Sequence, residues 1–163
     1  MRPKVIIDCD PGHDDAIAIM MAADLTEVLG ITTVSGNAPL NLTTDNALLL
    51  AELVGLNVEI HAGAEKPLLV AARHAEEAHG KTGLDGPVRP AVTRSSASSD
   101  AVRFLIETIR NNDDVWLVPI GPQNPIQIRI HLPFGNSSEF LSSEILESIS
   151  NGFVQKTSFI DLD

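Results

Sequence analysis

Four carboxylates lie close together near the amino end of the chain. Asp8, Asp10, Asp14 and Asp15 fall within eight residues, and a Pro-Gly pair separates the first two from the last two. Carboxylates held this close either raise one another's pKa or bind a cation. Calcium takes about 6–8 oxygen ligands, including carboxylates and main-chain carbonyls, whereas magnesium requires a stricter octahedron. The cluster therefore predicts a divalent-cation site.

Two other interpretations of the cluster stay open at this point. Asp14 and Asp15 could simply stabilise the start of a helix through its dipole, which would explain two of the four carboxylates. A phosphatase site of the haloacid-dehalogenase type also begins with a strand and Asp-x-Asp, but Pro11 and Gly12 follow here instead of Thr or Val. Cys9 lies between two carboxylates, which disfavour its thiolate, so we do not interpret it as a nucleophile.

The elements that must position these residues alternate along the chain. Short apolar runs predict strands, and apolar residues at helical spacing predict helices between them. Such alternation indicates an α/β fold, with a mainly parallel sheet and flanking helices. We expect Ser98 or Ser99 to cap the last helix. The predicted strands cover residues 5–7, 29–34, 58–61 and 115–118, the predicted helices cover about 14–23, 42–54 and 100–111, and residues 64–96 form a long loop.

Three polar or turn-forming segments follow the predicted strands. They are residues 8–15, 35–37 and 119–122. Because ligands bind outside the carboxyl ends of parallel strands, we expect these segments to meet at one edge of the sheet. Loops as long as 64–96 are uncommon in compact domains and are often functional.

The composition excludes several classes of function. The chain has 163 residues, a formal net charge of -11 and 44% hydrophobic residues. An acidic chain of this kind suits neither nucleic acid nor an anionic membrane surface, since both attract Lys and Arg. The single cysteine excludes an intramolecular disulfide. We find neither a signal-peptide core nor an apolar run of about 20 residues, so we expect a cytoplasmic protein.

Four segments together resemble the signature of the inosine/uridine-preferring nucleoside hydrolases. They are residues 5–16, 30–37, 79–87 and 117–122. The resemblance implies an enzyme that cleaves the N-glycosidic bond of ribonucleosides and gives a base and ribose. It also implies Ca²⁺ as the cofactor and a ribonucleoside as the substrate. Oxygen-liganded calcium orients and acidifies a water molecule, and a nearby carboxylate can complete its deprotonation.

The resemblance also assigns roles to individual residues. Asp10, Asp15 and the main-chain carbonyl of Ile120 would bind the metal ion, and Asp10 would also accept a proton from the attacking water. Asp8 would support the site from behind these ligands. Asp14 would hold ribose hydroxyls.

Two further residues are expected to contact the substrate. Asn37 would help to place the sugar, although after Gly36 it could be only a turn residue. His79 would lie near the base, although it could equally be a solvated loop histidine. The remaining histidines match no role in the motifs and are expected to be structural or exposed: His13, His61, His74 and His131.

The resemblance stops abruptly after Pro122. We therefore divide the chain into residues 1–122, the N-terminal part of a nucleoside hydrolase domain, and residues 123–163, a divergent tail that an out-of-frame or alternatively spliced transcript would explain. Family members are much longer, and their distal half supplies a further metal ligand, a general acid and ribose contacts. A second hypothesis is therefore a truncated, non-catalytic chain that binds metal or joins full-length subunits, since family members form dimers or tetramers. Base preference does not follow from this sequence.

Overall fold

The computed structural model describes residues 1–67, 71–86, 88–121 and 155–157. Its strands are β1 (Lys4–Cys9), β2 (Glu27–Thr33), β3 (Glu59–Ala62), β4 (Val115–Pro119) and β5 (Gln155–Thr157), and its helices are α1 (His13–Leu25), α2 (Leu40–Leu53), α3 (Glu76–His79) and α4 (Ala101–Arg110). The predicted alternation is confirmed as far as β4, and the long loop contains the short helix α3. Apart from 155–157, the predicted tail lies outside the described residues.

The sheet has the strand order β3-β2-β1-β4-β5. β1 pairs in parallel with β2 and with β4, β2 pairs in parallel with β3, and β5 is antiparallel to β4. The chain therefore moves from β1 out to β3 and then returns to the other side of β1. Ligand crevices in such sheets open where the strand order reverses, at the carboxyl ends of the strands. Here that point lies between β1 and β4.

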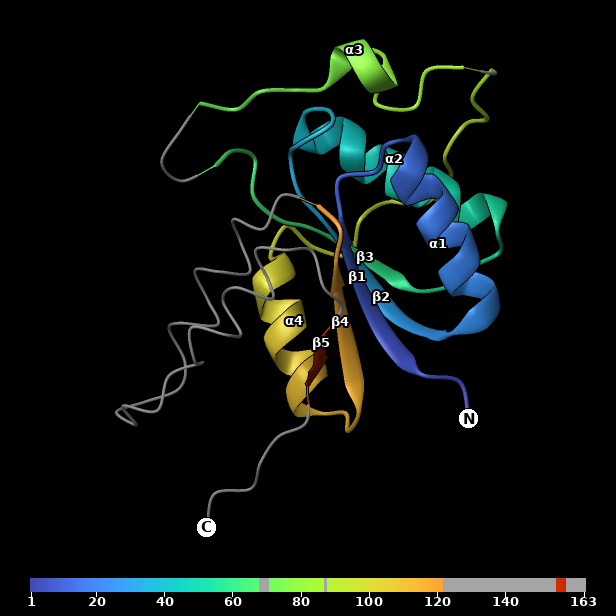
Figure 1. The fold of residues 1–163 in the computed structure, drawn as a ribbon, viewed down its shortest axis with the longest axis vertical. Coiled ribbons are helices and arrows are strands. Elements are labelled where there is room, and N and C mark those ends of the chain that lie inside the picture. The colour runs from blue at the N-terminus through green and yellow to red at the C-terminus, as the bar shows by residue number, and fades with distance from the viewer. Residues whose placement is uncertain (68–70, 87, 122–154, 158–163) are drawn as a thin grey trace.

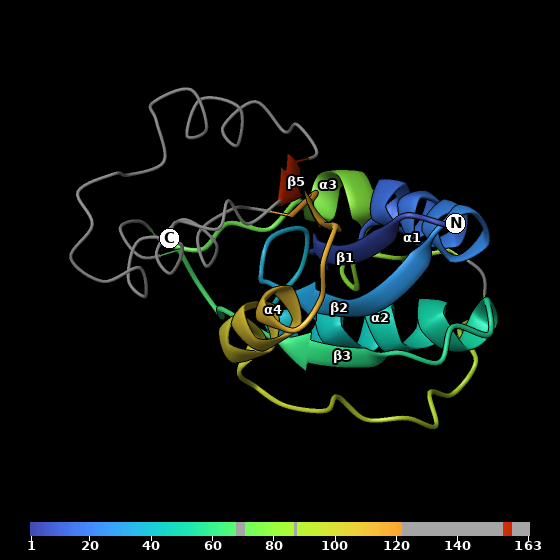
Figure 2. The same ribbon diagram turned by 90° about the horizontal axis from the view of Figure 1, so that it is seen from below.

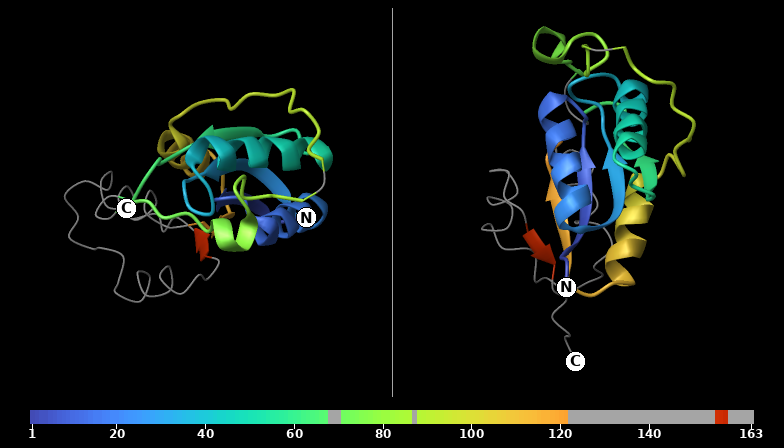
Figure 3. Two further views of the ribbon diagram at one scale, coloured as in Figure 1. Left: turned by 90° about the horizontal axis from the view of Figure 1, so that it is seen from above. Right: turned by 90° about the vertical axis from the view of Figure 1, so that its right-hand side faces the viewer.

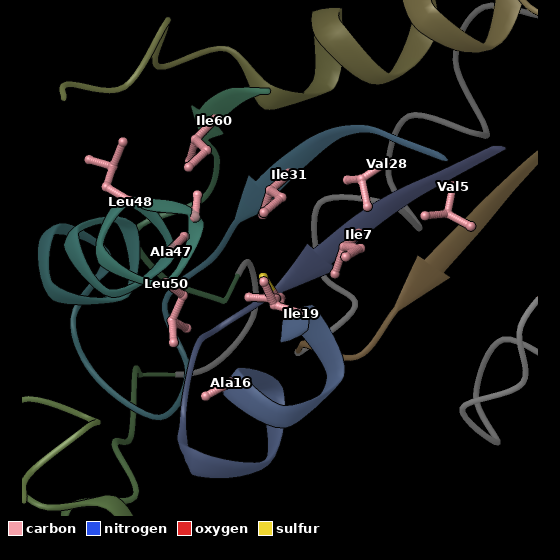
Figure 4. Close-up of a cluster of buried hydrophobic side chains, with 12 residues drawn as sticks. Val5, Ile7, Ala16, Ile19, Val28, Ile31, Ala47, Leu48, Leu50 and Ile60 are labelled. Atoms are coloured by element: carbon pink, nitrogen blue, oxygen red, sulfur yellow. The ribbon is translucent and has the colours of Figure 1, made fainter. Parts of the chain in front are cut away.

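Helices cover both faces of the sheet, with α1 and α2 on one side and α4 on the other (Figure 1). Alternating side chains of β1 serve the two faces: Val5, Ile7 and Cys9 pack toward α1 and α2, and Ile6 packs toward α4. Figure 4 shows the larger cluster, in which Ile19 of α1 meets β1, β2 and α2. This two-sided core fixes the position of the β1 carboxyl end.

Helix α1 is apolar on its outer side as well. Ile17, Met21 and Leu25 are 60%, 56% and 58% exposed, whereas Ile19 is fully buried. Beside the helix, an open apolar groove runs over β1 and β4; it is lined by Val5, Ile7, Ala18, Met21, Ala22, Leu25, Thr26, Val118 and Ile120. Within the described part of the chain, no helix has the length and apolar character needed to cross a membrane.

The packing of α4 depends on Gly30 of β2. A Cβ atom at Gly30 would lie 2.2 Å from Cζ of Phe104, whose ring stacks on His61 at a centroid distance of 4.0 Å. His61 is thus structural, as expected. The predicted serine cap of α4 is wrong, because the side chain of Asp100 accepts the N–H of Arg103, while Ser98 bonds to His61.

We predict that Gly30→Ala destabilises the fold, because the new methyl group displaces the Phe104 ring. Overpacking of this kind typically costs about 1–3 kcal/mol. Gly86→Ala is the matched control, since a Cβ atom there meets nothing within 4 Å. Urea unfolding followed by circular dichroism measures both changes. Equal midpoints for the two variants would contradict this account of the α4 contact.

Candidate functional site

The turn after β1 places Asp15 beside the end of the strand. β1 ends at Cys9 and α1 begins at His13, so the chain reverses over three residues. The N–H of Gly12 donates to Oδ2 of Asp15 at 3.0 Å. This bond satisfies a main-chain donor that the helix itself leaves without a partner. It also holds the Asp15 carboxylate, which is 3% exposed, over the turn.

Asn37, which follows β2, joins Asp10 to Asp15. Its main-chain N–H donates to Oδ2 of Asp10 at 2.6 Å, and its side-chain amide donates to the carbonyl of Asp10 at 3.0 Å and to Oδ2 of Asp15 at 3.4 Å. Asn37 therefore does more than close the turn at Gly36. The structure thus brings together three of the predicted site residues, with Asp10 after β1, Asn37 after β2 and Asp15 in the first turn of α1.

Asp8 lies behind this group and is almost fully buried. Its Oδ1 accepts the hydroxyl of Thr32 at 2.5 Å, while Oδ2 has no hydrogen-bond partner among the described residues. Burial raises the pKa of Asp8 to about 7; the Thr32 bond opposes this change and the charge of Asp15 adds to it. Burial also raises the pKa of the Cys9 thiol, helped by the neighbouring carboxylates, which agrees with an unreactive thiol.

The carboxylates of Asp10 and Asp15 are both difficult to ionise. Burial raises the pKa of Asp10 to about 7, partly offset by the Asn37 N–H, and the charges of Asp15 and Asp14 raise it further. Burial raises the pKa of Asp15 to about 6, partly offset by the Gly12 N–H, with a further increase from Asp14. Asp14 itself is exposed on the first turn of α1. The site thus concentrates negative charge in a poorly hydrated place.

The end of β4 closes the site from the other side. The N–H groups of Ile120 and Gly121 donate to the carbonyl of Asp8 at 2.8 Å and 3.1 Å. A Cβ atom at Gly121 would lie 2.9 Å from the carbonyl carbon of Cys9 and 3.1 Å from the nitrogen of Asp10. Only glycine lets the two main chains approach this closely. The main chain of Ile120 and Gly121 therefore lies against the main chain of residues 8–10, and metal binding by the Ile120 carbonyl stays a prediction.

Asn46 of α2 ties the long loop to this group. It is fully buried, and its amide donates to the carbonyls of Pro11 and Thr82, both at 2.9 Å. It thus holds the segment 79–86 over the turn after β1. Our sequence reasoning missed Asn46, because a lone amide in the middle of a helix gives no spacing signal.

His79 and His13 meet at the open side of the site. Figures 2 and 3 show α3 next to α1, and the side chain of His79 contacts both the ring and the main-chain N–H of His13. A Cβ atom at Gly12 would lie 2.7 Å from the Asn37 amide and 2.8 Å from Nδ1 of His79. His13, to which the motifs gave no role, therefore belongs to the site. Its position in the motif, two residues before Asp15, was the available signal.

Within the part of the chain that the structure describes, no three or more His, Cys, Asp or Glu side chains are grouped to hold a metal ion. The metal ligands predicted from the sequence are only two carboxylates, of Asp10 and Asp15, and the main-chain carbonyl of Ile120. Oxygen donors of this type suit calcium or magnesium rather than zinc or copper. Any further ligands must come from water, from a substrate or from protein outside these residues.

The chain belongs to the inosine-uridine preferring nucleoside hydrolase family, whose model matches residues 5–130. The match extends beyond Pro122, and the boundary that we placed there stays a prediction. Among curated proteins, it is 45% identical over 134 residues to the pyrimidine-specific ribonucleoside hydrolase RihB of Escherichia coli, covering 80% of this chain and 43% of the relative. The chain thus spans less than half of that relative.

The chain is also similar in structure to solved nucleoside hydrolases. An inosine-guanosine nucleoside hydrolase superposes with a TM-score of 0.71 at 28% identity, over 81% of this chain and 43% of the other. A purine-preferring ribonucleoside hydrolase from Gardnerella vaginalis superposes with a TM-score of 0.67 at 26% identity, over 76% of this chain and 42% of the other. The α/β fold inferred from the sequence is confirmed.

We predict that the metal-free chain loses stability as the pH rises. The pKa values of Asp8, Asp10 and Asp15 are about 7, 7 and 6 in the folded state, and the ordinary value is 3.8. The folded state therefore binds protons more tightly than the unfolded state, and this stabilisation, complete below about pH 4, disappears as the pH passes through about 6 to 7.

The measurement is thermal unfolding with a chelator at several pH values between 5 and 8. We expect the midpoint temperature to fall across this range, and to fall less in Asp8→Asn. Asp24→Asn, at an exposed position of α1, should behave like the unsubstituted chain. A midpoint that rises with pH in the chelated chain would refute the assigned shifts.

Proposed function

We propose that this chain carries the N-terminal part of a calcium-dependent ribonucleoside hydrolase site. The reaction is the hydrolysis of the N-glycosidic bond, in which a nucleoside and water give a base and ribose. The observation that carries the proposal is the joining of Asp10 and Asp15 by Asn37 at the carboxyl edge of the sheet. Membership of the family supports the reaction class.

The residues present fit calcium. Two of the three hydrogen bonds from Asn37 and the bond from Gly12 reach these carboxylates at Oδ2, so the Oδ1 atoms of Asp10 and Asp15 are available as ligands. Burial, and to a smaller extent the neighbouring carboxylates, raise the pKa of both groups, and a divalent cation would stabilise their ionised forms. The carbonyl of Ile120 would add a third oxygen. Calcium accepts an irregular set of oxygens more readily than magnesium.

The side chains then have distinct tasks. Bound calcium would supply a charge that orients a water molecule and lowers its pKa. Asp10 would accept the proton of that water, and Asn37, which holds Asp10 in place, would keep its carboxylate oriented. The attack would meet a ribose carbon with oxocarbenium character, as in the hydrolysis of other glycosides.

Asp14 and His79 would contact the substrate. Asp14 is exposed at the start of α1, beside Asp15, where its carboxylate can accept hydrogen bonds from sugar hydroxyls. His79 lies against Gly12, on the loop that Asn46 binds through the carbonyl of Thr82. Asp8 would stabilise the site from behind, through its bond to Thr32.

We propose ribonucleosides as the class of substrate, without a preference for one base. The names of the relatives specify different bases: pyrimidine-specific, purine-preferring and inosine-guanosine. Of the described residues, His79 is the one that we expect to lie near the base. We therefore propose a test with one purine and one pyrimidine nucleoside.

The test is the release of ribose from inosine and from uridine by the purified chain, with calcium and with a chelator. We expect release that requires calcium. Asp10→Asn should lower the rate at least about 10²-fold, since it removes the general base. Asp24→Asn provides a matched control, because it removes one carboxylate of α1 away from the site. Release that is unchanged in Asp10→Asn would overturn the proposed role of Asp10.

A second candidate function is association without catalysis, in which the chain binds metal or joins full-length subunits. The observation in its favour is the exposed apolar groove beside α1. Calcium binding without ribose release, together with co-elution of the chain with a full-length relative on size exclusion, would favour this candidate over the first.

A further inference from the structure

The loop segment that carries His79 has internal hydrogen bonds that give it a shape of its own. The side chain of Asp85 accepts the main-chain N–H groups of Lys81 and Thr82 at 2.9 Å and 3.0 Å. The N–H of Asp85 donates to the carbonyl of His79 at 3.1 Å. All these bonds lie within residues 79–86. They do not determine where the segment lies relative to the carboxylates of the site, which depends on contacts with other elements.

Asn46 makes such a contact through both protons of its side-chain amide. One proton is donated to the carbonyl of Thr82, in the loop segment, and the other to the carbonyl of Pro11, in the turn between β1 and α1. Both N–O distances are 2.9 Å. Because a carbonyl oxygen only accepts, the nitrogen of the amide faces these two groups. Asn46 thus ties the loop segment to the turn that follows Asp10.

Space filling alone does not explain an asparagine at position 46. The side chain is fully buried, and its Oδ1 atom has no hydrogen-bond partner among the described residues. Burying a polar atom in this way costs free energy. An apolar side chain of similar size, such as the buried Leu48 of the same helix, would fill the space without that cost. Two donations from one short, uncharged side chain do explain it.

Gly83 allows the loop segment to approach Asn46. Its φ is +81°, a conformation that residues with a Cβ atom rarely adopt. A Cβ atom there would lie 3.1 Å from Nδ2 of Asn46 and 3.3 Å from the carbonyl oxygen of Pro11. A methyl group at position 83 would therefore displace the segment at its point of attachment.

We propose that Asn46 is a positioning residue, whose two donations hold His79 at a fixed place beside the turn after β1. His79 lies against Gly12 of that turn, where a Cβ atom would be 2.9 Å from Cε1 of the imidazole. Contact between His79 and a substrate rests on the proposed function. The position of His79 relative to the turn does not.

The first test is the exchange of side-chain amide protons with solvent in the unsubstituted full chain, followed by nuclear magnetic resonance. Both amide protons of Asn46 should exchange slowly, because they are buried and hydrogen-bonded. Asn41, at an exposed position earlier in α2, is the internal control and should exchange quickly. Equal exchange rates for the two side chains would overturn the proposal.

The second test is Asn46→Leu, which keeps the approximate size of the side chain and removes both donors. In the unsubstituted chain, we expect a nuclear Overhauser effect between Hα of Gly12 and Hε1 of His79. This effect should be lost or greatly weakened in Asn46→Leu. Asn41→Ala is the matched control, since it removes an exposed amide from the same helix, and it should leave the effect unchanged.

Trypsin cleavage of the same variants measures how easily the loop segment opens. Cleavage after Lys81 should rise at least about tenfold in Asn46→Leu, relative to cleavage after Arg73, because two hydrogen bonds are lost and cleavage follows the population of the open form. Arg73 lies in the same long loop but outside the segment. A general loss of stability would raise cleavage at both positions, so their ratio isolates the local effect.

Gly83→Ala tests the attachment from the loop side if circular dichroism shows that Asn46→Leu does not fold, and it should give the same two changes. The proposal is overturned if either variant folds and keeps both the Gly12–His79 contact and the cleavage ratio of the unsubstituted chain. None of these measurements requires catalysis. A failure of ribose release would therefore count against the proposed function and leave this result standing.

Discussion

The burial of three carboxylates at one place is the constraint on which the rest of this structure depends. Asp8, Asp10 and Asp15 lie at the end of one strand and the start of the next helix, and each has a raised pKa because it is poorly hydrated. Such a group is stable only when protons, hydrogen-bond donors or a cation offset the charge. The protein supplies part of that compensation through Thr32, Asn37 and the N–H of Gly12.

The residues that surround these carboxylates come from separate elements of the fold. β2 brings Thr32 and Asn37, α1 returns Asp15 over the turn, and β4 brings Gly121 against the main chain of Asp10. Glycine at position 12 lets the side chains of Asn37 and His79 lie close to the turn. Glycine at position 121 lets the chain after β4 lie close to the main chain at Asp10. The two-sided core around β1 keeps the strand end rigid, which is what a set of ligands on a short turn requires. The segment 79–86 then covers the site from outside.

Much of the fold could be predicted from the sequence, because short apolar strands and helical spacing are local signals. The meeting of Asp10, Asp15 and Asn37 also followed, since the carboxyl ends of parallel strands share an edge. The contact between His13 and His79 could not be predicted, because it joins residues 66 positions apart. Asn46 was missed because a lone amide in the middle of a helix gives no spacing signal. The cap of α4 was assigned to a serine, because neighbouring Ser and Asp residues are almost equal as caps and only the main-chain geometry decides between them.

The central claim is that Asp10 and Asp15 bind a divalent cation, and calorimetric titration of calcium into the full chain tests it most directly. The titration should be run near pH 6.5 in two buffers with different heats of ionisation. Since a cation must displace protons from carboxylates with raised pKa values, we expect binding to release protons and the two measured heats to differ. Binding should be lost in Asp15→Asn and kept in Asp24→Asn. Calcium binding that releases no protons and survives Asp15→Asn would contradict the account.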